Sequence, residues 1–201
     1  MADNKIGKHS FRPGRPVSIA AWASVAGKKE GEGPLGSQFD IVSRDTRFGE
    51  ATWEQAEKKM QQLALDTLMQ KAGILPGELD LVFSGDLLNQ CICSSFTLRN
   101  RDIPHLGLYG ACSTMAEGLL LSSLLIDSKA VKRAIALTSS HFCTAERQYR
   151  FPLEYGGQRT PTNQWTATAS GAVVVGRGGT VQIQAVCLGR VCDLGVTDMN
   201  N

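Results

Sequence analysis

The segment YGACSTM at 109–115 carries the strongest chemical signal in the sequence. A short apolar run ends at Gly110, and Cys112 stands where the next helix is predicted to begin. Backbone N–H groups and the helix dipole at such a position favour a thiolate and can hold an oxyanion or a carboxylate. Free cysteines are also among the most buried residue types, so Cys112 is equally consistent with an apolar core thiol.

His141 is the second candidate, because it directly follows the apolar run that ends in TSS at 138–140. That position places it at the same carboxyl edge of a parallel sheet as Cys112, where ligands of α/β proteins gather. A histidine there can orient or deprotonate a cysteine. The simpler alternative is a loop histidine that is hydrogen-bonded to nearby backbone.

The segment SGDLLNQ at 84–90 follows another apolar run and brings Asp86 and Asn89 to the same edge. Asp and Asn are also ordinary turn residues, so this signal is weaker. Further on, the polar and aromatic stretch 141–158 contains Arg147 and Arg150. These arginines either form surface ion pairs or bind an anionic ligand in a bidentate manner.

A helix over Trp53–Ala72 is the clearest of the elements that position these residues. Thr52 and Gln55 have the spacing of a capping box, and Gly73 ends the helix. Its apolar residues share one face, with Glu, Gln and Lys on the opposite one, which predicts an amphipathic helix lying on a sheet. The apolar face comprises Trp53, Ala56, Met60, Leu63, Thr67 and Leu68.

Three short apolar runs at 79–84, 105–109 and 133–140 have the length of buried strands. The helix predicted at 113–127 is apolar nearly all round, so we expect it to be covered on most sides, between two layers. Strands that alternate with helices predict an α/β protein with a largely parallel sheet.

The two ends of the chain differ from this core. Residues 1–50 read as a loop-rich segment with a short strand near 17–22, and the core spans 51–190. Near the end, two strands joined at 176–179 predict an antiparallel hairpin, and the last ten residues hold no completed element. The predicted order is therefore βαβαβαββ.

Composition excludes several functional classes. The 201 residues include 21 basic and 19 acidic side chains, so the net charge of +2 gives no footprint for nucleic acid. No apolar stretch approaches the roughly 18 residues of a spanning helix, and the N-terminus lacks a signal peptide. We therefore expect a soluble or peripheral protein. The six cysteines lack zinc-site spacing, so we expect free thiols and no bound metal.

Several motifs together resemble the stage V sporulation protein AD family of the thiolase-like superfamily. The motif GACST alone indicates only a relative of thiolases or ketoacyl synthases, whereas the segment 141–158 is far more specific. Met115 departs from the family, in which Ser is common at this position. The matching motifs are EGPLGS (32–37), GDLLNQ (85–90), GACST (110–114), TSSH and TAERQ within 138–148, and EYGGQ (154–158).

The resemblance implies a layered αβαβα fold built from two similar halves, of which residues 1–201 form the first. The helix after Cys112 would then be one of a central pair. The second half supplies further pocket walls and, in thiolases and ketoacyl synthases, the remaining catalytic residues. Their absence from this chain favours a binding protein over an enzyme.

The resemblance also implies a function, which is to bind dipicolinic acid, free or as its calcium chelate, and to assist its uptake into the developing spore. The expected place is the spore inner membrane, beside the other stage V sporulation membrane proteins AA–AF, in a homodimer. By motif, Cys112 matches the nucleophile position, His141 a neighbouring pocket position, and the 85–90 loop the rim. The predicted ligand contacts are Asp86, Asn89, Cys112, Ser113, His141 and Arg147.

The Asp86 carboxylate would repel a bound dianion. We therefore expect Asp86 either to hold His141 protonated or to contact a calcium ion carried by the ligand. Two other functions remain open. One is an acyltransferase of the thiolase or ketoacyl synthase type, with Cys112 as its nucleophile. The other is a structural subunit whose ancestral site is vestigial.

Overall fold

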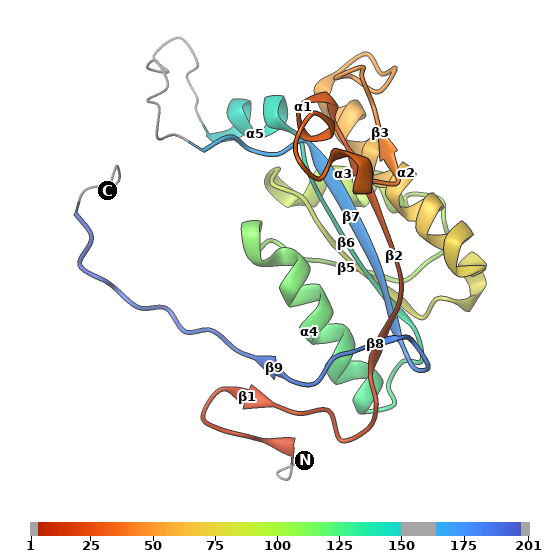
Figure 1. Ribbon diagram of the computed structural model, residues 1–201, viewed down its shortest axis with the longest axis vertical. Coiled ribbons are helices and arrows are strands. Elements are labelled where there is room, and N and C mark those ends of the chain that lie inside the picture. Colours follow the sequence, from red (N-terminus) through yellow and green to blue (C-terminus); the bar gives the residue numbers. More distant parts are fainter. Residues whose placement is uncertain (1–3, 150–163, 198–201) are drawn as a thin grey trace.

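A computed structural model describes residues 4–149 and 164–197, which form a central sheet with helices on both faces (Figure 1). Along the sheet the order is β3-β2-β7-β6-β4-β5, and β8 pairs with β2 outside this path. Among these described strands, all on the path except β7 run in the same direction. The predicted α/β class with a mostly parallel sheet is confirmed. The strands are β2 (Ser18–Ala26), β3 (Ile41–Val42), β4 (Leu81–Gly85), β5 (His105–Gly107), β6 (Ala134–Ser140), β7 (Ala169–Gly176) and β8 (Val181–Gln182).

The helices form one layer on each face of the sheet (Figure 1). On one face lie α2 (Trp53–Ala72) and α3 (Ile92–Leu98), and on the other lies α4 (Thr114–Asp127). Alternate strand residues face the two layers: Val82 and Ile135 pack with α2, and Phe83 packs with α4. The remaining elements are α1 (Lys28–Gly31), α5 (Phe142–Tyr149) and a small antiparallel pair, β1 (Ser10–Phe11) with β9 (Val186–Cys187).

The predicted helix α2 has the bounds and the ends expected from its sequence. The Thr52 hydroxyl accepts from the Gln55 N–H and the Gln55 side chain accepts from the Thr52 N–H, which completes the capping box. Gly73 ends the helix in the left-handed region at φ 63°. The prediction that its Glu and Gln residues lie on the polar face is wrong for Glu57 and Gln61. Both are fully buried.

Helix α4 lies close to β6 because small residues face the sheet. A methyl group at Gly118 would lie 2.9 Å from the Ala136 Cβ. We expected α4 to be covered by protein on most sides, but the side that faces away from the sheet is partly exposed. Leu120 and Leu121 are half-buried and Leu124 is 39% exposed, because no second layer of the described chain packs there.

The predicted C-terminal hairpin is wrong. β7 and β8 do not pair with each other, because β2 lies between them and pairs antiparallel with both. β2 is accordingly longer than the short strand predicted at 17–22 and lies inside the sheet. Helices α3 and α5 were not placed by the sequence patterns. None of the described helices has the length and apolarity needed to cross a membrane.

The contact between Gly118 and Ala136 predicts that Gly118→Ala destabilises the protein although alanine is the better helix former. The added methyl group forces α4 away from β6, and overpacking of this kind outweighs the propensity gain by roughly 1 to 2 kcal/mol. Chemical denaturation measures the free energy of unfolding. Gly77→Ala is the matched control, because a methyl group there meets no atom within 4 Å. Equal stabilities of the two variants would contradict this packing.

Candidate functional site

The predicted site residues follow parallel strands that end at the same edge of the sheet. Asp86 follows β4, Cys112 comes after β5 and His141 follows β6. Helix α5 and the start of α4 lie at this edge (Figure 1). The topology therefore brings the three loops together, but the side chains differ in what they contact.

Cys112 is exposed and lies in a short 3₁₀ turn (Ala111–Ser113) that leads into α4. Ala111 has a positive φ of 48°, a strained conformation for a residue with a side chain. Ser113, the N-cap residue of α4, does not cap the first turn with its side chain, because its hydroxyl donates to the Gly110 carbonyl at 2.8 Å. The positive end of the α4 dipole therefore lies beside an accessible thiol.

Two tyrosines that the sequence analysis did not select lie at the same edge. The hydroxyls of Tyr109 and Tyr149 are 3.2 Å apart, and Tyr149 also donates to the Leu87 carbonyl at 2.7 Å. The hydrogen bond with Tyr109 raises the pKa of Tyr149 to about 12, together with burial and the nearby charges of Tyr109, Asp86 and Cys112. Tyr109 stands in the motif YGACSTM, close to Cys112, and Tyr149 stands in the polar and aromatic stretch 141–158, so these two segments carried the available signal.

Asn89 is exposed and contacts the tyrosine pair. Arg147 has no described bond with either tyrosine or with Asn89. The Tyr109 hydroxyl donates to the Asn89 side-chain oxygen at 3.4 Å. Arg147 forms an ion pair of 2.9 Å with Glu54 of α2. This is the surface pairing that was one of the two expectations for the arginines. Arg150 and the EYGGQ motif lie outside the described residues.

His141 is buried and does not reach Cys112 in any described hydrogen bond. Its Nε2 lies 2.8 Å from the Thr46 carbonyl, and its Nδ1 accepts from the Cys143 N–H at 3.1 Å. Nε2 must therefore carry the proton, and burial lowers the pKa of His141, so the ring is neutral. In this arrangement it positions the start of α5 and is not a base for the thiol.

Asp86 also turns inward, away from the predicted rim. Its carboxylate accepts from the N–H of Leu88 and from both the N–H and the hydroxyl of Ser94, at 2.7–3.0 Å. These bonds fix the loop between β4 and α3. The hypothesis that Asp86 holds His141 protonated is wrong, because His141 is neutral and each has other partners.

A buried polar network continues from Asp86 beneath the edge of the sheet. The Gln61 amide donates to the hydroxyls of Ser94 and Ser139, at 3.1 and 2.8 Å. Ser139 in turn donates to Glu57 at 2.8 Å. The network joins α2, α3 and β6.

Glu57 also contacts Thr144 of α5, and this bond indicates which form the carboxyl group takes. The Thr144 hydroxyl lies 2.6 Å from Glu57 Oε2 and 2.9 Å from the His141 carbonyl, but it has one proton to donate. A protonated Glu57 resolves the conflict, because it donates to Thr144, which then donates to His141. Burial raises the pKa of Glu57 to about 7, consistent with this arrangement.

Glu57, Asp86 and Cys93 offer ligand atoms within 4.8 Å of one another, but they do not fit a metal ion. Both oxygens of each carboxyl group are engaged by hydroxyl or amide groups. Burial raises the pKa of Cys93, so its thiol stays protonated. The cluster is a hydrogen-bond network and not a metal centre.

Comparisons with known proteins agree with this fold. A family model described as Stage V sporulation protein AD (SpoVAD) matches residues 7–201. The chain is 42% identical over 193 residues to Stage V sporulation protein AD of Bacillus subtilis (strain 168). That match covers 96% of this chain but only 57% of the relative's length.

Several solved structures have a similar fold. ChlB3, an acyltransferase, has a TM-score of 0.55 and 15% identity, over 84% of this chain and 52% of its own. The 3-oxoacyl-[acyl-carrier-protein] synthase III of Aquifex aeolicus VF5 has a TM-score of 0.51 and 16% sequence identity. The match covers 81% of this chain and 54% of the synthase chain. A variant of Xanthomonas campestris OleA has a TM-score of 0.54 and 14% sequence identity. The match covers 81% of this chain and 56% of the OleA chain. At these identities the likeness concerns the fold alone, and it confirms a thiolase-like half.

The raised pKa of Glu57 predicts that stability falls as the pH rises. The folded-state pKa of about 7 lies above the unfolded value of 4.5, so the stabilisation is complete below about pH 4.5 and is lost as the pH passes 7. Between pH 5 and pH 8 the loss amounts to roughly 2 to 3 kcal/mol. Urea unfolding of the native chain and of Glu57→Gln at both pH values isolates this contribution. Identical pH dependence in the two proteins would refute a protonated Glu57.

Proposed function

This chain belongs to the stage V sporulation protein AD family, and we propose that it supplies one wall of a pocket that binds dipicolinic acid. The observation that carries the proposal is the position of Cys112, exposed at the start of α4 beside two tyrosine hydroxyls. The chain spans 57% of its relative's length, so the other walls of the pocket would come from the remaining part of such a protein.

The chemistry of this edge suits a planar aromatic dianion. The positive end of the α4 dipole attracts carboxylates, and the tyrosine rings add an aromatic surface. The Tyr109 hydroxyl, whose bonds to Leu87 and Asn89 are long at 3.4 Å, can turn to donate to the ligand. Tyr149 donates its own proton to the Leu87 carbonyl and lies beside the Tyr109 hydroxyl, which it helps to position. Asn89 adds an amide group on the same side. The ligand binds free or as its calcium chelate, in which case the metal belongs to the ligand.

In this proposal the residues of the buried network position the pocket without contacting the ligand. His141 and Asp86 fix the loops that follow β6 and β4, and Arg147 ties α5 to α2. The proposal extends to a wider role, in which the protein assists dipicolinate uptake into the developing spore. It works at the spore inner membrane with the other stage V sporulation proteins AA–AF, as a homodimer.

Two substitutions test the pocket by isothermal titration of dipicolinate, with and without calcium. Tyr109→Phe removes the hydroxyl that can turn to the ligand and weakens binding by about three- to tenfold. Cys112→Asp places a negative charge beside the dianion and weakens binding by at least about tenfold. Cys187→Asp is the matched control, because Cys187 is also exposed but lies on β9.

The titration is carried out on this chain and on the longer polypeptide that includes the part corresponding to the rest of the relative. Binding only to the longer form means that the pocket is shared between the two parts. Absence of binding to both forms, or equal loss of affinity in Cys187→Asp and Cys112→Asp, would rule out the proposal.

The geometry of Cys112 also supports a second function, acyl transfer. An accessible thiol at a helix start, preceded by the strained Ala111, is an arrangement suited to a nucleophile. The thiolate would attack the carbonyl carbon of an acyl-CoA and release the CoA thiol, leaving a thioester on Cys112. His141 does not serve as its base here, so the base would have to come from another part of the protein.

Intact-mass measurement after incubation with acetyl-CoA distinguishes the two functions. Acyl transfer predicts an acetyl adduct in the native protein that is lost in Cys112→Ala and retained in Cys187→Ala. A binding protein gives no adduct at Cys112 while dipicolinate still binds.

A further inference from the structure

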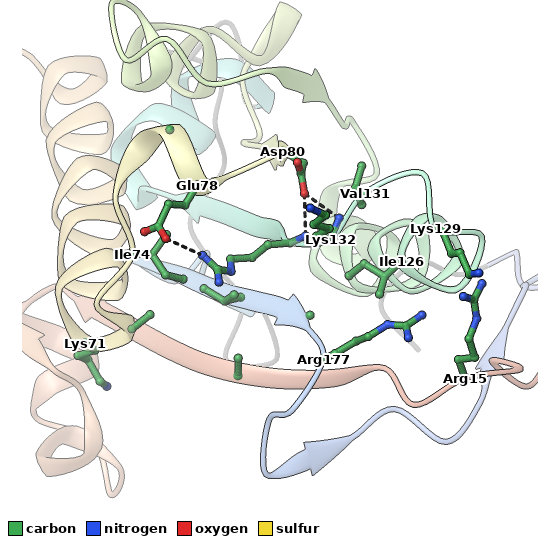
Figure 2. A pocket seen from close by; sticks show the side chains of 16 residues that line it. Arg15, Lys71, Ile74, Glu78, Asp80, Ile126, Lys129, Val131, Lys132 and Arg177 are labelled. Atoms are coloured by element: carbon green, nitrogen blue, oxygen red, sulfur yellow. Dashed lines mark hydrogen bonds and ion pairs between the residues drawn. The ribbon is translucent and has the colours of Figure 1, made fainter.

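A concave region lies at the end of the sheet opposite Cys112. It is a pocket of about 890 Å³ at the amino ends of β4 and β6, beside the end of β7 (Figure 2). Its walls come from the loops that lead into β4 and β6 and from the segments next to β2 and β7. Its basic residues are Arg15, Lys71, Lys129, Lys132, Arg133 and Arg177, and its acidic residues are Glu78 and Asp80.

Half of these basic residues have a partner for the side chain, which is a backbone carbonyl for Arg15 and a carboxylate for the other two. The Arg15 guanidinium donates to the backbone carbonyl of Asp127, and the Arg15 backbone N–H donates to the carboxylate of the same residue. Lys71 forms an ion pair of 2.7 Å with Asp40. The Arg133 guanidinium lies 3.9 Å from the Glu78 carboxylate.

The other three cations, Lys129, Lys132 and Arg177, have no side-chain partner within 4–149 and 164–197. One carboxylate faces them, that of Asp80, and it accepts from the backbone N–H groups of Lys132 and Arg133. Three unpaired cations against this one carboxylate leave a surplus of about two positive charges in a chain whose total is +2. Since unpaired like charges in a concave site repel one another, the surplus favours an anionic occupant.

The dipole of a helix accounts for the position of one of these three cations but not for the other two. Lys129 follows the C-terminus of α4, where a cation interacts favourably with the helix dipole. Lys132 precedes β6 and Arg177 follows β7, so neither gains from that dipole. Figure 2 shows Arg177 extending toward the end of the pocket where Arg15 and Lys129 lie.

We propose that this pocket binds a phosphate-type dianion, either as a soluble phosphate compound or as the headgroup of an anionic lipid. The charge of such a group matches the surplus of two, and Arg177 can hold two of its oxygens at once. Apolar side chains beside the cations accommodate the body to which the phosphate is attached. They are Ile74, Ile126, Val131 and Val174. This site is separate from the proposed dipicolinate pocket and does not depend on it.

Lys129 offers a variant that removes charge without harming the fold. Its backbone adopts the left-handed conformation with φ 67°, which glycine adopts more readily than lysine. We therefore expect Lys129→Gly to keep or raise the melting temperature while it weakens anion binding. Arg177→Gln removes the second cation, and Lys28→Gln, at an exposed lysine of α1, is the control for net charge.

Isothermal titration with inorganic phosphate, in a phosphate-free buffer, tests the soluble form of the ligand. The expected result is saturable binding that falls about tenfold in Lys129→Gly and in Arg177→Gln and stays unchanged in Lys28→Gln. Sedimentation with phosphatidylglycerol vesicles, against phosphatidylcholine vesicles, tests the lipid form. Binding to anionic vesicles alone, lost in the same two variants, would identify a headgroup as the source.

Two results would overturn the proposal. One is no binding to phosphate or to anionic vesicles. The other is binding that Lys129→Gly and Arg177→Gln leave intact, because the anion would then be held elsewhere on the protein.

Discussion

The buried hydrogen-bond network around Gln61 and Glu57 is the constraint on which the arrangement of the candidate site depends. It links α2 to β6, to α3 through Ser94 and to α5 through Thr144. A buried polar group that loses its partner costs about 1 to 3 kcal/mol, so each member holds the others in one arrangement. The loops after β4 and β6 are fixed by the same set, since Asp86 accepts from Ser94.

This constraint divides the residues at the carboxyl edge into two groups. Those that face inward, among them His141 and Asp86, are hydrogen-bonded to the backbone or to Ser94 and do not face a ligand at the surface. Those that face outward, Cys112 with Tyr109 and Tyr149, remain accessible beside the start of α4. Ligand chemistry is therefore expected from the outward group, and the inward group determines where it lies. The basic pocket at the other end of the sheet is independent of both.

Local patterns in the sequence were sufficient for much of the fold. The capping box at Thr52 and the short apolar runs predicted α2 and the strands, because these signals depend on neighbouring residues. The pairing of β7 with β2 was not predictable in this way, since it joins segments about 150 residues apart. The burial of Glu57 was missed for a related reason: its partners, Ser139 and Thr144, come from distant parts of the chain. The sequence predicted that the site residues lie at one edge of the sheet. It did not predict which of their side chains face inward and which face outward.

A structure of the protein bound to dipicolinate tests the central claim most directly, namely that the ligand site lies at the carboxyl edge of the sheet. The account predicts the ligand at the start of α4, with a carboxylate near the Cys112 backbone and the tyrosine pair alongside. His141 and Asp86 would keep their present hydrogen bonds. Dipicolinate bound between Lys129 and Arg177 instead, or contacting His141 after a rearrangement of the buried network, would contradict it.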